Sequence, residues 1–203
     1  FKISTDAAAY QIKIYRLGYY NGDGARFITN ILPSVSLPQV QPTPIIDATN
    51  GLTDCGNWSN SASWQVPTNA VSGIYIARPV RSDTLGASHI VFVVRDDAST
   101  NLLFQTSDTT WQAYNNYGGN NLYGGVGPGE GAAPGRAYKV SYNRPNITRL
   151  TIEYYSLWIG EYPMIRWLER NGYDVSYTTG VDSDRRGSLL LQHRAFLSVG
   201  HDE

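Results

Sequence analysis

The sequence predicts a mixed β plus α/β fold, with a β-sandwich over residues 1–82 and an α/β domain over residues 83–203. Short stretches of alternating apolar and polar residues, separated by turn-forming residues, fill the first part and are typical of a sandwich. The second part opens with a continuous apolar run and places one amphipathic helix between strands. This change in pattern is the reason for expecting two domains.

The N-terminal part contains strand signals broken by turns and prolines. In residues 10–14, apolar side chains alternate with Gln and Lys at the period of a half-buried strand. Residues 21–24, Asn-Gly-Asp-Gly, tolerate positive φ angles and predict a tight turn. Four prolines in residues 33–44 predict an edge or linker stretch rather than a central strand. Residues 71–80 predict a further strand.

The C-terminal part has the strand and helix signals of an α/β layer. The apolar run at residues 89–95 fits a strand buried on both faces, as in a parallel sheet. Residues 102–106 predict a second strand. Residues 162–171 predict a helix with one apolar face, a proline in its first turn and a glycine after its end. Residues 174–178 and 194–200 predict two more strands.

Composition excludes several classes of function. The 203 residues include 16 basic and 17 acidic side chains, and no basic stripe that would attract nucleic acid. No apolar run approaches the roughly 20 residues that span a bilayer. The single cysteine, Cys55, excludes a disulfide within this sequence. Only three lysines are present, and polarity comes from Asn, Ser, Thr and Tyr, which favours a secreted or extracellular location. The sequence starts and stops inside structural patterns, so we expect further domains of the same chain.

The sharpest local motif follows the last predicted strand. Gly200 precedes His201, Asp202 and Glu203, and ligands of α/β sheets bind beyond the carboxyl ends of strands. Residues 201 and 203 alternate and can face the same side, where an imidazole and a carboxylate can bind a metal or exchange protons. The alternative is a polar strand end that caps a neighbouring helix or is solvated.

Tyrosines and glycines dominate the segment after residues 102–106. Tyrosinate oxygens in residues 109–119 would suit Fe(III), although most tyrosines are structural or form stacking platforms. Residues 115–135 contain 8 glycines, which indicates an ordered functional loop or a mobile one. Residues 136–145 hold two arginines, a lysine and two tyrosines, and fit either the lining of a polar site or a surface hairpin. Common hydrolase, nucleotide-binding and zinc-protease motifs are absent from the sequence.

Several stretches, taken in order, resemble the N,N-dimethylformamidase large (β) subunit family, and most closely its secreted bacterial relatives. They are residues 15–26, 58–67, 72–75, 92–97, 110–115, 142–145, 161–163 and 198–203. The resemblance implies a β-sandwich followed by a three-layer α/β domain similar to the glutamine amidotransferase fold, here truncated at its C-terminal end.

The resemblance also implies a metal-dependent hydrolase acting on the C–N bond of a linear amide. Its site is a mononuclear iron, Fe(III), held by two tyrosines and a glutamate beside a histidine. Matched by position, Tyr114 and Glu203 are metal ligands and His201 is the catalytic residue. Tyr138 is the second tyrosine ligand, with Tyr142 as the alternative. Three anionic oxygen donors favour a hard, highly charged ion over zinc or copper.

The substrate would be a small-molecule or peptide-like amide, and the protein could form a homo-oligomer. Five residues are expected to line the substrate pocket: Trp111, Asn115, Tyr117, Tyr142 and Arg144. Trp111 and Tyr117 would keep the pocket dry.

Two other readings stay open. The first is a non-catalytic extracellular glycan-binding or adhesion module on the same fold, which the aromatic residues and low charge would suit. The second is a structural domain of a large surface protein. A measurement of metal content would distinguish both alternatives from the metal-dependent hydrolase.

Overall fold

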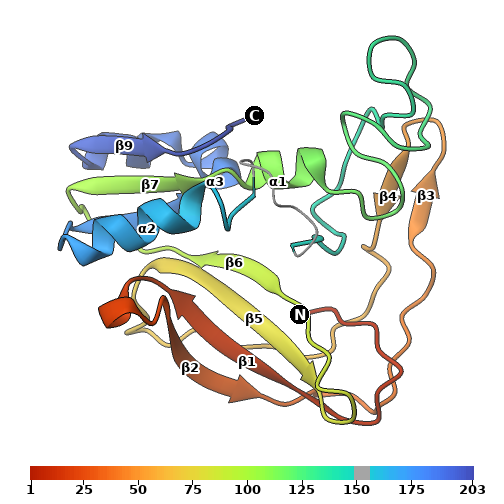
Figure 1. Ribbon diagram of the computed structural model, residues 1–203, viewed down its shortest axis with the longest axis horizontal. Coiled ribbons are helices and arrows are strands. Elements are labelled where there is room, and N and C mark those ends of the chain that lie inside the picture. The colour runs from red at the N-terminus through yellow and green to blue at the C-terminus, as the bar shows by residue number, and fades with distance from the viewer. Residues whose placement is uncertain (149–155) are drawn as a thin grey trace.

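The computed structural model describes residues 1–148 and 156–203, which form three β-sheets (Figure 1). An antiparallel sheet has the order β2-β1-β5-β6, β3 pairs with β4, and a parallel sheet has the order β8-β7-β9. The strands are β1 (Tyr10–Leu17), β2 (Ala25–Ile31), β3 (Ile45–Asp47), β4 (Leu52–Asp54), β5 (Gly73–Arg81), β6 (Ile90–Val94), β7 (Leu102–Thr106), β8 (Val175–Thr179) and β9 (Ala195–Ser198). The helices are α1 (Asp108–Tyr114), α2 (Glu161–Arg170) and α3 (Gly180–Arg185), with 3-10 turns η1 (Tyr20–Gly22) and η2 (Gly187–Gln192). These elements confirm the mixed β plus α/β class.

The antiparallel sheet follows the predicted alternation. Tyr10, Ile12 and Ile14 of β1 are buried and pack in one hydrophobic cluster with Tyr75 of β5. The ring of Phe92 lies 5.6 Å from that of Tyr75 and extends the cluster to β6. Side chains on one face of this sheet therefore form the first core.

The prediction for residues 89–95 is wrong in its sheet type. β6 pairs antiparallel with β5, with Val91 opposite Ile76. It is the edge strand of the first sheet rather than a strand of the parallel sheet. A continuous apolar run marks burial but does not specify the neighbouring strand, which explains the error.

Three of the four strands predicted in the C-terminal part form a parallel sheet. β7 lies between β8 and β9, and the three strands end at the same edge, at Thr106, Thr179 and Ser198. Helix α1 begins two residues after β7, so its residues are held next to that edge. The predicted strands at residues 102–106 and 194–200 are confirmed with small shifts at their ends.

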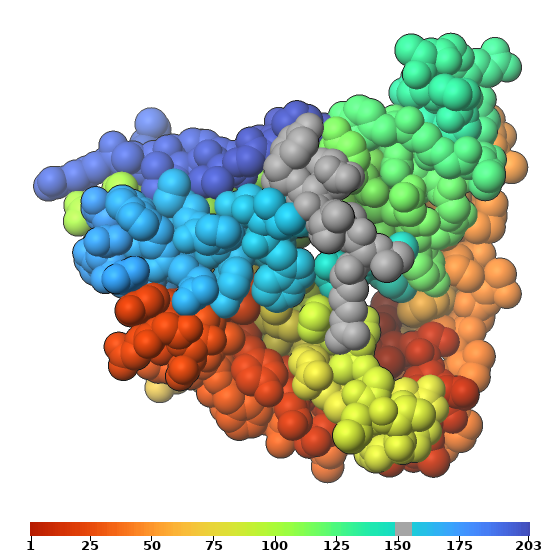
Figure 2. All heavy atoms as spheres, in the orientation of Figure 1, coloured from red at the N-terminus to blue at the C-terminus, as the bar shows by residue number. Residues whose placement is uncertain are grey.

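Helix α2 lies between the two larger sheets (Figures 1 and 2). Its buried residues Ile165 and Leu168 pack with Ile76 of β5, Phe104 of β7 and Tyr177 of β8. This second core joins the antiparallel and parallel sheets, because one helix contributes apolar contacts to both.

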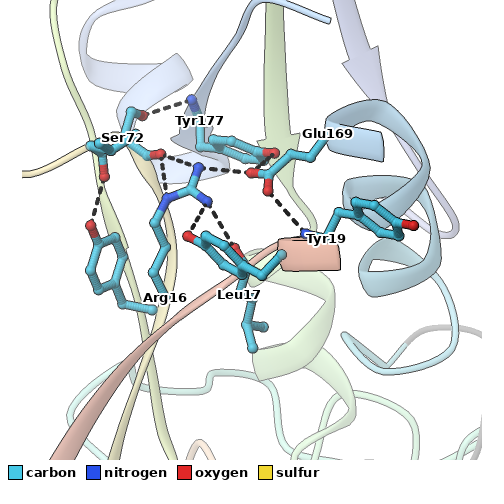
Figure 3. A network of polar contacts seen from close by, with 9 residues as sticks. Arg16, Leu17, Tyr19, Ser72, Glu169 and Tyr177 are labelled. Carbon is cyan, nitrogen blue, oxygen red and sulfur yellow. Dashed lines mark hydrogen bonds and ion pairs between the residues drawn. The ribbon is translucent and has the colours of Figure 1, made fainter. Parts of the chain in front are cut away.

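A buried ion pair reinforces this junction (Figure 3). The Arg16 guanidinium of β1 lies 2.8 Å from a Glu169 carboxylate oxygen of α2. Arg16 also donates two hydrogen bonds to the Ser72 carbonyl, and Glu169 accepts from the Tyr177 hydroxyl and the Tyr19 backbone N–H. The charges are thus both paired and hydrogen-bonded, as burial requires.

The long segment after α1 packs beside β3 and β4 (Figure 1). The Asn120 amide donates to the Gly51 carbonyl at 2.8 Å, and the Tyr138 N–H donates to the Asn50 carbonyl at 2.8 Å. The glycine-rich part also bonds to itself, with Gly127 N–H donating to Gly135 at 2.6 Å. These bonds favour the ordered loop over the mobile one, the two alternatives that the sequence left open.

Among the described residues, no helix is long and apolar enough to cross a membrane. The two-sheet sandwich, the three-layer arrangement and the domain boundary after residue 82 stay predictions.

Candidate functional site

Three segments meet beyond the carboxyl ends of the parallel strands, near the C-terminal end marked in Figure 1. Tyr114 is the last residue of α1, Tyr123 comes from the glycine-rich loop, and His201 and Glu203 follow β9. We call these four residues the tyrosine–glutamate cluster. They lie at the edge where ligands of parallel sheets bind, as the sequence predicted for residues 201 and 203.

Contacts within the tyrosine–glutamate cluster are direct. The rings of Tyr114 and Tyr123 stack with centroids 4.4 Å apart and an angle of 14°. The Tyr123 hydroxyl donates to Glu203 Oε2 at 2.5 Å, and His201 Nδ1 lies 3.2 Å from Glu203 Oε1. The imidazole is also 6.2 Å from the Tyr114 ring. The phenol rings of Tyr114 and Tyr123, the Glu203 carboxylate and the His201 imidazole therefore lie close together.

Thr110 fixes the position of the C-terminal tail. Its buried hydroxyl donates to the His201 carbonyl at 2.8 Å and accepts from the Glu203 N–H at 3.1 Å. Asp202, between them, instead accepts hydrogen bonds from Gln105 and Ser198. Gly200, at φ +81°, turns the chain after β9, and the His201 and Glu203 side chains meet on the same side.

Asparagine side chains hold the loop that carries Tyr123. Asn121 Oδ1 accepts from the backbone N–H groups of Tyr123 and Gly124, at 2.7 and 2.9 Å. The Leu122 N–H donates to the carbonyl of Ala113 in α1. These bonds tie the loop to the helix that provides Tyr114.

Tyr123 is the residue of the tyrosine–glutamate cluster that the sequence prediction missed. It lies among glycines with positive φ, and Gly125 at φ +125° turns the chain back toward Gly119. The available signal was the pair Asn120 and Asn121, because asparagine side chains often bond to nearby backbone and hold turns.

The hydrogen bond to Glu203 changes the acidity of Tyr123. Together with burial, it raises the pKa of the Tyr123 phenol well above its usual value of 10.0. A carboxylate acceptor stabilises the protonated phenol and repels the phenolate. Tyr123 is therefore a neutral hydrogen-bond donor at neutral pH unless a cation displaces its proton.

The other two tyrosines considered as ligands lie elsewhere. Tyr138 is about half exposed, with its hydroxyl near the Pro128 carbonyl and the Arg136 guanidinium over its ring. The Tyr142 hydroxyl donates to Asp108 at 2.8 Å, at the start of α1. The structure brings neither of them to Glu203.

Four of the five expected pocket residues line one pocket of about 1020 Å³ between β6 and α1. They are Trp111, Tyr117, Tyr142 and Arg144. Asn115 is buried but does not line it, because its side chain bonds to the Pro145 carbonyl and to backbone N–H groups of the following loop. No residue of the tyrosine–glutamate cluster lines this pocket.

Glu161 is a buried carboxyl that the sequence analysis did not single out. At the start of α2, it accepts from the Ser107 N–H at 2.6 Å and from the Trp111 indole N–H at 2.8 Å. Burial raises the pKa of Glu161 to about 8, against the opposing effect of these two donors. Glu161 thereby links α2 to the first turn of α1.

Across residues 1–148 and 156–203, no group of three or more His, Cys, Asp or Glu side chains is arranged to hold a metal ion. A metal at the tyrosine–glutamate cluster would need tyrosine oxygens. The donor set of Tyr114, Tyr123 and Glu203, with His201 beside them, fits a hard cation such as Fe(III).

A comparison with known protein families shows to which family the chain belongs. The family model described as N,N-dimethylformamidase beta subunit-like, C-terminal, matches residues 11–203. The chain belongs to this family. A search of curated proteins gave no match. The N,N-dimethylformamidase beta subunit-like match covers the whole tyrosine–glutamate cluster, and the family name indicates amide hydrolysis as its activity class.

Proposed function

We propose that the tyrosine–glutamate cluster is an iron-dependent site that hydrolyses the C–N bond of a linear amide. The observation that carries the proposal is the direct contact of Tyr123 with both Tyr114 and Glu203, from three separate segments. Tyr114, Tyr123 and Glu203 would hold the ion. Tyr123 takes the place that the sequence analysis gave to Tyr138.

When bound, the iron would supply Lewis acidity for polarising an amide carbonyl and acidifying water. Glu203 has a second task, since its Oε1 lies near His201 Nδ1 and would orient the imidazole. With Nδ1 engaged in this way, we assign proton exchange to His201 Nε2. His201 would accept a proton from water and deliver it to the leaving amine nitrogen.

The finer fold and assembly assignments are also proposals. The parallel order β8-β7-β9 with α2 on one face supports a three-layer domain similar to the glutamine amidotransferase fold. The family description as a beta subunit supports assembly with another subunit. A secreted location and a small or peptide-like amide substrate rest on the sequence analysis alone.

Metal content and the visible spectrum test the proposal. We expect one iron per chain and a tyrosinate-to-iron charge-transfer band that Tyr114→Phe, Tyr123→Phe and Glu203→Gln abolish. Tyr138→Phe is the matched control, because it also removes one hydroxyl but should keep both signals. Hydrolysis of a panel of linear amides should follow the iron content.

A folded protein that takes up no iron would overturn the proposal and favour the glycan-binding alternative. Loss of the band in Tyr138→Phe but not in Tyr123→Phe would overturn the ligand assignment alone.

A further inference from the structure

The pocket between β6 and α1 has apolar walls and lies apart from the tyrosine–glutamate cluster. Aromatic residues from three parts of the chain line it, with Trp58 before β5, Phe92 in β6 and Trp111 in α1. Its volume of about 1020 Å³ is at the upper end of the usual range for small-molecule sites. The polar groups in these walls determine which kind of ligand the pocket can bind.

Arg144 is the unusual polar group of the pocket. It is 7% exposed and lines the pocket, yet it has no ion-pair partner among residues 1–148 and 156–203. Among the described residues, its guanidinium bonds only to backbone carbonyls, those of Gln112, Tyr117 and Asn120. A buried cation without an anion is costly and calls for a counter-charge.

The unused donors of Arg144 have a defined geometry. Nη1 makes two hydrogen bonds and Nη2 makes one, out of five N–H groups in a guanidinium. Neither Nε nor the second Nη2 hydrogen bonds to a described residue. Nε–H and Nη2–H point in parallel from one edge of the guanidinium, which is the fork that a carboxylate accepts in a bidentate pair.

The charged residues around Arg144 also favour the binding of an anion in this pocket. Lys2 and Arg185 line the same pocket, and neither has an acidic partner in the part of the chain that the structure describes. Asp108, the one acidic residue in the described lining, already accepts from the Tyr142 hydroxyl, the Thr106 hydroxyl and the Gly180 N–H. The described lining is therefore net positive.

We propose that this pocket is a second binding site, for a small carboxylate with an aromatic or apolar body. The carboxylate pairs with the Nε and Nη2 fork of Arg144, and the body packs against Phe92 and Trp111. Gln112 provides a further polar contact, because it lines the pocket and its buried Oε1 has no partner among the described residues. A ligand with an N–H or O–H group would satisfy it.

Titration calorimetry with benzoate as the probe tests this site. We expect saturable binding of benzoate, and binding of benzamide at least about tenfold weaker, because the neutral amide has the same shape but no charge. Arg144→Lys keeps the positive charge but loses the fork, and should weaken benzoate binding about tenfold. Arg136→Lys, outside the pocket, is the matched control and should leave binding unchanged.

Two further variants keep the result interpretable. Glu203→Gln should bind benzoate like the wild type, since the tyrosine–glutamate cluster is not part of the pocket. This separates the proposal from the hydrolase proposal, which depends on Glu203. Phe92→Ala should weaken binding through the apolar wall, and it leaves the backbone bonds of Arg144 in place. Equal affinity for benzoate and benzamide, or no saturable binding of benzoate, would overturn the proposal.

Discussion

Arg16 of β1 and Glu169 of α2 form a 2.8 Å ion pair that joins the antiparallel sheet to the helix above it. Both side chains are largely buried, with 9% and 18% of their surface exposed. We predict that Glu169→Gln lowers the free energy of unfolding by about 3 kcal/mol, because it leaves a buried guanidinium unpaired. Urea denaturation followed by circular dichroism measures this change. The exposed pair of Arg81 with Asp6 is the control, and Asp6→Asn should have no measurable effect.

The pH dependence of stability should report on Glu161. Its pKa is raised from 4.5 to about 8 in the folded protein, so the folded state binds an extra proton between these values. The contribution of Glu161 to the free energy of unfolding is fully present below 4.5, its pKa in the unfolded chain. This contribution is lost as the pH rises through about 8. In Glu161→Gln this part of the slope should disappear. Unfolding curves across this pH range test the prediction, and an unchanged slope in the variant would contradict it.

Two neighbouring glycines give a sharp test of the loop that carries Tyr123. Gly125 has φ +125°, and a Cβ there would lie 2.2 Å from the Gly119 carbonyl oxygen. Gly124 has open space around its Cβ position. Gly125→Ala should therefore displace the loop and reduce iron uptake, at a strain of about 1–3 kcal/mol. Gly124→Ala should keep iron uptake, and similar losses in both variants would argue against this geometry.

Thr110 and Thr109 form a second matched pair. The Thr110 hydroxyl bonds to the backbone of both His201 and Glu203, whereas the Thr109 hydroxyl has no hydrogen-bond partner in the part of the chain that the structure describes. Thr110→Val should loosen the C-terminal tail and lower iron affinity about tenfold, because a ligand shifts when its support is lost. Thr109→Val should have little effect. Competition with a chelator measures both affinities, and equal values for the two variants would refute the role of Thr110.

Much of the fold could be predicted because periodicity reports local structure. The alternation in residues 10–14 and the amphipathic pattern before Gly172 predicted β1 and α2 well. Strand pairing depends on the whole chain, so the apolar run that became β6 was assigned to the wrong sheet. Burial is likewise a tertiary property. Glu161 has the pattern of an ordinary acidic residue at a helix start, although it is 2% exposed.

The candidate site was predicted in part. The resemblance pointed to Tyr114, His201 and Glu203, and the predicted strand at residues 194–200 placed His201 and Glu203 at a sheet edge. Helix α1, which ends at Tyr114, was not predicted. Tyr123 lies in the glycine-rich segment and Tyr138 lies just after it, and composition does not specify which tyrosine returns to the sheet edge. The hydrogen bonds that Asn121 Oδ1 accepts from the backbone of Tyr123 and Gly124 hold the loop in place, and they appear only in the folded structure.

The long reach of the contacts to Glu203 has a consequence for folding during synthesis. Glu203 is 80 positions from Tyr123 and 93 from Thr110. The growing chain has to reach residue 203, and β9 has to pair with β7, before these contacts can form. Contacts between such distant positions form late because loop closure is costly. The tyrosine–glutamate cluster thus assembles on the ribosome only after the antiparallel sheet has been synthesised.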